Sequence, residues 1–214
     1  MLPSTQTAAF YLPGLVHQFG NLLLTVQGHV MHVEPDGIPH MQDVVLGAVQ
    51  RGGASLQVLR VLLGVKTGAM GSAYDLLSQV VELGGVPARE SGVSLECRGD
   101  EPKATIWVSA DPFVFAVAET LRHWIKAVRT GSNGTATVAL HKDADGMVRV
   151  RLGYQPVAGS LPFPMPAEAV AKTVAEHAQA AGGEVRAVAA GADGAFGEIE
   201  LSFAAGTFAP SSEA

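Results

Sequence analysis

The sequence has little of what marks a secreted, membrane-spanning or nucleic-acid-binding chain. It contains one cysteine, Cys97, so no intramolecular disulfide can form and a reducing, cytoplasmic location is expected. Asp and Glu (20) outnumber Lys and Arg (14), and the net charge of −6 argues against broad binding to nucleic acid or acidic membranes. The start shows no basic segment before an apolar run, and charged or amide side chains interrupt the apolar region at 44–65, so neither a secretory signal nor a membrane span is expected.

Apolar residues are abundant, and they first appear in two helical stripes. They make up 48% of the 214 residues, enough for a packed core in one sizeable domain or two small ones. The segment VEPDGIP, residues 33–39, places two prolines around Asp-Gly and predicts a tight turn between the stripes. The stripes consist of Leu15, Phe19, Leu22, Val26, Val30 and Val33, and of Val45, Val49, Gly52, Leu56, Leu59 and Leu63.

These stripes predict an antiparallel helical hairpin within about residues 1–67. A single hairpin has too small a core to be stable alone, so we expect two copies to pair as a dimeric four-helix bundle, with the chain a homodimer. Residues 68–208 read as an α/β domain in which helices cover one antiparallel-rich sheet, and 209–214 as a loose tail. The fold class expected is therefore α+β.

The elements of the second domain follow from periodicity and turn residues. KDADGM, residues 142–147, predicts a hairpin loop between two strands. Helices are expected over 73–85, 111–131 and 166–183, and strands over 93–98, 104–110, 135–141, 148–154, 184–190 and 197–203.

One face of the first helix carries a histidine among small and polar residues. At about 100° per residue, His17, Asn21, Leu24 and Gly28 share the side opposite the apolar stripe. This position exposes the imidazole, but spacing alone does not separate a reactive histidine from an ordinary surface one. The other histidines show no spacing that converges on a metal ion, so no metal site is expected.

The segment GLVHQFGNLLLTVQGHV, residues 14–30, resembles the phosphoacceptor segment of sensor histidine kinases, whose common form is G-x-A-H-D-F-N-N-L-L-T-x-I-x-G. Residues 109–128 are similar to the first helix of the kinases' ATP-binding domain, and residues 169–203 to its closing helix, Gly-Gly turn and two strands. The resemblance covers nearly the whole chain in the same order and implies a histidine-kinase-type fold. The matching positions in the first segment are Gly14, His17, Phe19, Asn21, Leu22, Leu23 and Gly28.

The same resemblance shows what the chain lacks. Arg122 and Lys126 stand where the kinases have two asparagines that bind Mg²⁺ and phosphate, and an ammonium group has no lone pair to offer a cation. GYQPVAGS (153–160) has no carboxylate for adenine, and LPFPMPAEA (161–169) has three prolines in place of a glycine-rich lid. Gln18 replaces the acidic residue that serves as a base after the histidine. We therefore expect a degenerate ATP domain without autokinase activity or a cofactor of its own; the alternative is that Arg122 and Lys126 bind a nucleotide in another way.

What remains resembles the dimeric histidine phosphotransferases of bacterial phosphorelays. The resemblance implies that His17 accepts phosphate, with Gln18 and Asn21 beside it, and that Gly20, Leu24 and Gly28 belong to the docking surface. The partners implied are receiver domains of response regulators, which would bring the Mg²⁺, with a hybrid histidine kinase as a further candidate. Two alternatives stay open: a receiver phosphatase that uses Asn21, and a non-catalytic pseudokinase scaffold.

Overall fold

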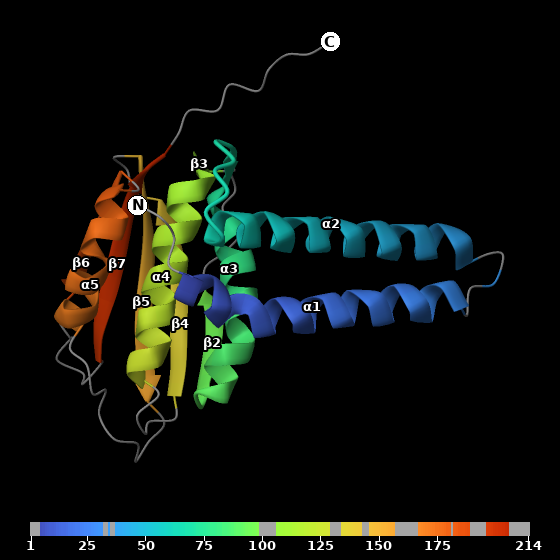
Figure 1. Ribbon diagram of the computed structural model, residues 1–214, viewed down its shortest axis with the longest axis horizontal. Helices are drawn as coiled ribbons and strands as arrows, with labels where there is room; N and C mark the ends of the chain where they lie inside the picture. The colour runs from blue at the N-terminus through green and yellow to red at the C-terminus, as the bar shows by residue number, and fades with distance from the viewer. Residues whose placement is uncertain are drawn as a thin grey trace, which may run out of the picture.

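A computed structural model describes residues 5–31, 34, 37–98, 106–128, 134–142, 146–156, 167–180, 182–188 and 196–205. Helices α1 (Thr5–Met31) and α2 (Ile38–Leu62) project as a long antiparallel hairpin from an α/β body (Figure 1). At the hairpin tip the N–H of Gly37 donates to the carbonyl of Glu34 over 2.9 Å, which closes the predicted turn. The predicted α+β class and the helical hairpin are therefore confirmed.

The body contains a five-stranded sheet in the order β2-β4-β5-β7-β6. Strand β2 pairs in parallel with β4, and the other neighbours pair antiparallel, so the sheet is antiparallel-rich as predicted. The predicted strand at 104–110 contains β3, but β3 pairs with β1 in a separate two-stranded sheet; β1, which has three residues, was not predicted. The elements of the body are β1 (Met70–Ser72), α3 (Ala73–Glu90), β2 (Val93–Arg98), β3 (Trp107–Ser109), α4 (Ala110–Val128), β4 (Gly134–Lys142), β5 (Met147–Pro156), α5 (Ala167–Ala180), β6 (Gly183–Val188) and β7 (Phe196–Ala204).

Helices α3, α4 and α5 lie over one face of the sheet (Figure 1). Alternate strand residues such as Val150 and Leu201 are buried beneath them, as the two-residue period of a strand requires. The buried cluster does not end at the body, because Tyr11 and Leu15 of α1 belong to it. The base of the hairpin therefore shares the core of the α/β body.

The second predicted stripe differs from the buried side of α2. Val49, Leu56 and Leu63 are exposed, Val49 by 64%, whereas Ala48 and Ser55 are buried. Small residues face α1 because they let the two helix backbones approach closely, and the larger apolar residues are turned to the side. Of the predicted stripe, Gly52 therefore faces α1, whereas Val49, Leu56 and Leu63 are exposed in the single chain.

Several sequence predictions fall on residues outside the described ranges. These include the tail at 209–214, Val33, and residues 157–166 of the segments compared with the adenine site and the lid. In the part of the chain that is described, no helix has the length and apolar character needed to cross a membrane.

Candidate functional site

His17 is exposed on α1, three residues beyond Gly14, which is buried against α3. The Asn21 side chain, one turn on, places its Nδ2 3.2 Å from His17 Nε2. With the amide nitrogen as donor, Nε2 holds the lone pair and the ring proton is on Nδ1. The nitrogen that can act as a nucleophile therefore lies beside an amide at the surface.

Gln18 is turned the other way, into the junction of three helices. Its Oε1 accepts a hydrogen bond of 2.6 Å from Ser55 Oγ of α2. The same hydroxyl lies 3.0 Å from Gln79 Oε1 of α3, and also from the carbonyl oxygen of Arg51. A hydroxyl has one proton, so these acceptors compete for it. Gln18 thus joins α1 to α2 through Ser55, whose hydroxyl also lies beside Gln79 of α3, and an amide cannot serve as a base for His17.

The residues expected to dock a partner are exposed. Leu24 is 68% exposed, and a Cβ added at Gly20 or Gly28 would meet no atom within 4 Å. The face around His17 is therefore open at Gly20, Leu24 and Gly28. The docking role itself stays a prediction.

Beside this face is a small hollow of about 110 Å³, formed where α1, α2 and α3 meet. Polar side chains from all three helices line it, so it is suited to water or a polar group. Its lining residues are Gln18, Asn21, Leu22, Thr25, Arg51, Ser55 and Glu82.

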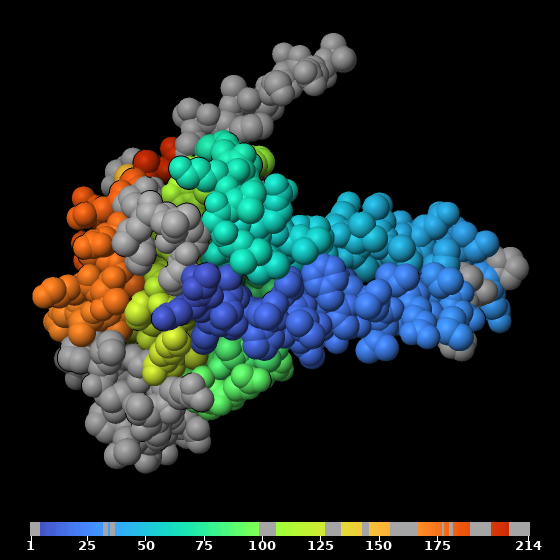
Figure 2. Space-filling model, in the orientation of Figure 1, coloured from blue at the N-terminus to red at the C-terminus, as the bar shows by residue number. Residues whose placement is uncertain are grey.

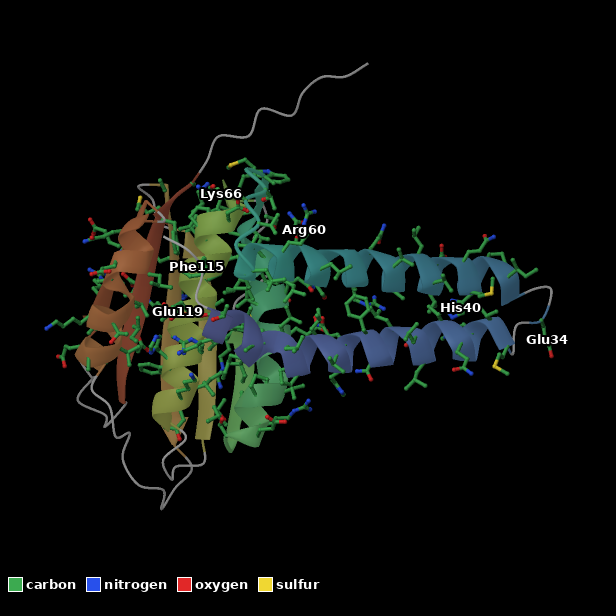
Figure 3. All side chains as sticks on the ribbon, viewed as in Figure 1. Glu34, His40, Arg60, Lys66, Phe115 and Glu119 are labelled. Carbon is green, nitrogen blue, oxygen red and sulfur yellow. The ribbon has the colours of Figure 1, made fainter. Side chains whose placement is uncertain are left out.

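At the nucleotide positions of the resemblance, Arg122 is committed to an internal ion pair. Its side chain is buried (the residue is 4% exposed), and its Nε donates to Glu119 Oε2 over 3.1 Å. Glu119, 2% exposed, also accepts from Thr7 of α1, and His123 Nε2 lies 3.1 Å from its Oε1. Figure 3 shows Glu119 on α4 at the base of α1. The start of α1 thus contacts α4 beside Arg122.

Glu119 stays ionised in this network. Burial by itself would raise the pKa of its carboxyl, but hydrogen bonds from His123, Arg122 and Thr7, together with the Arg122 charge, outweigh burial and hold the pKa well below its usual range. Lys126, one turn beyond Arg122, is exposed. Neither side chain has an oxygen with which to bind Mg²⁺.

Sequence reasoning found the His17 face but missed Thr7, Glu119 and Ser55. The available signal was weak: a Glu within the apolar run of α4, and a Ser among apolar positions of α2, are polar residues that need a buried partner. In the described ranges no group of three or more His, Cys, Asp or Glu side chains could hold a metal ion.

The sequence matches no protein-family model and no curated protein. Among solved structures, the chain is similar to a bacterial phosphotransferase, with 14% identity over 94% of this chain and 99% of that one and a TM-score of 0.45. It is similar to full-length ShkA in complex with AMPPNP, with 17% identity over 98% of this chain but 47% of that one and a TM-score of 0.48. It is also similar to the blue-light activated histidine kinase EL346 of Erythrobacter litoralis, with 12% identity, coverage of 87% and 62%, and a TM-score of 0.47. We assign neither a family nor an activity from values this low.

Proposed function

We propose that this protein is a histidine phosphotransferase that shuttles phosphate between receiver domains of response regulators through His17. The observation that carries the proposal is the exposed His17 imidazole, whose Nε2 lies 3.2 Å from the Asn21 amide nitrogen. The resemblance of residues 14–30 to the kinase phosphoacceptor segment supports the same role. A hybrid histidine kinase is a further candidate partner, because it carries a receiver domain.

Phosphate transfer requires from this chain a nucleophilic nitrogen, which His17 supplies. The Nε2 lone pair attacks the phosphorus of an aspartyl phosphate, the bond from phosphorus to the carboxylate oxygen breaks, and its electron pair leaves with the aspartate. Transfer to a second receiver reverses these steps. Asn21 then needs to release Nε2 and can donate its amide to a phosphoryl oxygen instead. The partner's receiver supplies the Mg²⁺, and no cofactor of this chain's own is proposed.

A homodimer forms part of the proposal because the hairpin exposes an apolar face. Val16, Leu23 and Val30 on α1 are exposed and spaced by seven residues. The same is true of Val49 and Leu56 on α2 and of Leu63, the residue that follows the helix. A seven-residue apolar repeat is the pattern of helices that pack against further helices.

The two sets lie on the same side of the hairpin. Gln18 and Leu22 of α1 contact Ser55 and Gly52 of α2 and mark the inward faces. At 100° per residue, the exposed apolar stripe is turned from the inward face by roughly a third of a turn on α1 and roughly a fifth of a turn on α2, in the same rotational sense. Because the helices are antiparallel, this puts both stripes on one side of the hairpin, and His17 falls on the other. A second copy can therefore cover the apolar face and leave His17 open, as a four-helix bundle would.

A receiver phosphatase is the second candidate, and the hollow beside Asn21 favours it. At about 30 Å³ per water molecule, it could hold about three or four waters next to an amide that can orient one for attack. In that reaction Asn21 is required and His17 is not. A non-catalytic scaffold is the outcome if neither residue matters.

The test uses receiver domains from the encoding organism, charged with ³²P-labelled acetyl phosphate. We expect label to pass to the wild type as a phosphoramidate, stable to base and labile to acid, and His17→Ala to abolish it. His40→Ala is the matched control because His40 is another exposed histidine of the hairpin, and it should accept no less label than wild type.

Asn21→Ala separates the two reactions. In a phosphotransferase the variant still becomes labelled, whereas in a phosphatase it no longer dephosphorylates the receiver. Label on His17→Ala, or no label on wild type with any receiver, would contradict the proposal.

A further inference from the structure

The first contact that fixes the hairpin is between Gly14 of α1 and Leu83 of α3. A Cβ added at Gly14 would lie 1.9 Å from the Leu83 carbonyl oxygen, a distance that no side chain can occupy. The two helix backbones therefore touch at this point. Gly14 precedes His17 by three residues, about one helical turn, so a shift of the backbone at Gly14 moves His17 directly.

A second contact holds the start of α1 on α4. The buried Tyr11 hydroxyl donates to the Ala118 carbonyl over 2.9 Å, and Thr7 donates to Glu119. Thr7 and Tyr11 are both fully buried, so the first turns of α1 are packed against the body. Figure 2 shows the first turns of α1 lying against the body before the hairpin projects from it.

A third contact holds the chain where it returns from α2 to the body. The backbone N–H groups of Thr67 and Gly68 donate to the Asp111 carboxylate over 2.7 and 2.9 Å, at the first turn of α4. Ala110 N–H donates to the Ala69 carbonyl over 2.9 Å. The hairpin is thus attached to the body at both of its ends, through α1 and through the segment that follows α2.

We infer that the α/β body is a fixed mount for the hairpin, and that Gly14, Thr7 and Glu119 are positioning residues for His17. Glu119 and Arg122 lie on the part of α4 whose sequence resembles the nucleotide site of histidine kinases. Here they form a buried ion pair, and Glu119 accepts a hydrogen bond from Thr7 of α1. A hairpin held at both ends cannot swing against the body without breaking buried hydrogen bonds. The consequence for phosphate transfer rests on the function proposed above, but the fixed geometry does not.

The geometry can be measured between two nitroxide labels, one on Cys97 of β2 and one on Gln27→Cys of α1. Cys97 is the only native cysteine and both sites are exposed, so one pair is created per chain. Dilution with unlabelled protein suppresses distances between copies. We expect a single narrow distance distribution, and Gly14→Ala to shift or broaden it. Gly20→Ala is the matched control, since its added Cβ meets open space and should leave the distribution unchanged.

Thr7→Val covers the case in which Gly14→Ala fails to fold. It keeps the side-chain shape and removes the donor to Glu119, so we expect a broader distribution. Thr173→Val is its control, because the exposed Thr173 hydroxyl donates to the Ala169 carbonyl of its own helix, α5. A broad distribution in wild type, or no change in either Gly14→Ala or Thr7→Val, would overturn the inference.

Transfer kinetics then test positioning. A small misplacement of a reacting group is costly, so we expect folded variants with altered distances to take label from a receiver roughly tenfold or more slowly in kcat, with KM changed less. An unchanged kcat in a variant with an altered distance would overturn the positioning role. If wild type accepts no label but the distances behave as expected, the fixed mount stands and the phosphotransferase proposal fails.

Discussion

Glu119 shows how one residue can link the two parts of this chain. Its carboxylate is buried on α4 and receives hydrogen bonds from Thr7 on α1 and from Arg122 on its own helix. Removing one partner of a buried ion pair leaves the other charge without compensation. We therefore expect Glu119→Gln to lower the free energy of unfolding at neutral pH by about 3–5 kcal/mol, measured by urea denaturation.

The pH dependence of the wild type gives a second readout of Glu119. A carboxyl whose pKa is lower in the folded than in the unfolded chain stabilises the fold fully above its unfolded pKa of about 4.3, and this stabilisation is lost as the pH falls below that value. Glu119→Gln should remove part of the loss between neutral pH and pH values near 3. Glu96→Gln is the control: its ion pair with Arg98 is exposed, so a change above about 1 kcal/mol there would contradict the argument.

At the scale of elements, local pattern predicted more than tertiary contact did. The period of 3.6 located α1, α2 and α4, and alternation located β4 and β5. It could not show that Val49 and Leu56 are turned away from α1, because both sides of α2 carry apolar residues and only packing selects between them.

Helix α4 also decides the expected response to nucleotide. Arg122 is buried against Glu119, and Lys126 offers a positive charge where Mg²⁺ needs an oxygen ligand. We expect titration calorimetry with Mg²⁺ and ATP to give no saturable heat in the micromolar range. A dissociation constant in the low micromolar range would restore the kinase interpretation, and loss of that binding in Lys126→Ala would locate the site.

For the whole molecule, the sequence predicted the candidate site on α1 better than it predicted how α1 packs against the α/β body. His17, Asn21 and Leu24 share a face that the helical period alone reveals. The contacts of Gly14 with Leu83 and of Thr7 with Glu119 join residues far apart in the chain, the latter 112 positions apart, and no local signal encodes such pairs. The sequence therefore placed the site on a helix, but it could not predict where that helix packs on the α/β body.

The proposed dimer follows from the apolar face as a whole, and Leu23 tests it. Leu23 is 69% exposed on this face, and a twofold dimer would bury it twice. At about 2 kcal/mol for each buried leucine side chain, we expect Leu23→Glu to raise the dissociation constant by roughly a thousandfold, measured by sedimentation equilibrium. Leu24→Glu is the matched control, because the adjacent leucine lies on the His17 side: it should leave the dimer intact and weaken labelling by a receiver. A monomeric wild type at micromolar concentration, or equal dissociation of the two variants, would contradict the bundle and leave the apolar face to a different partner.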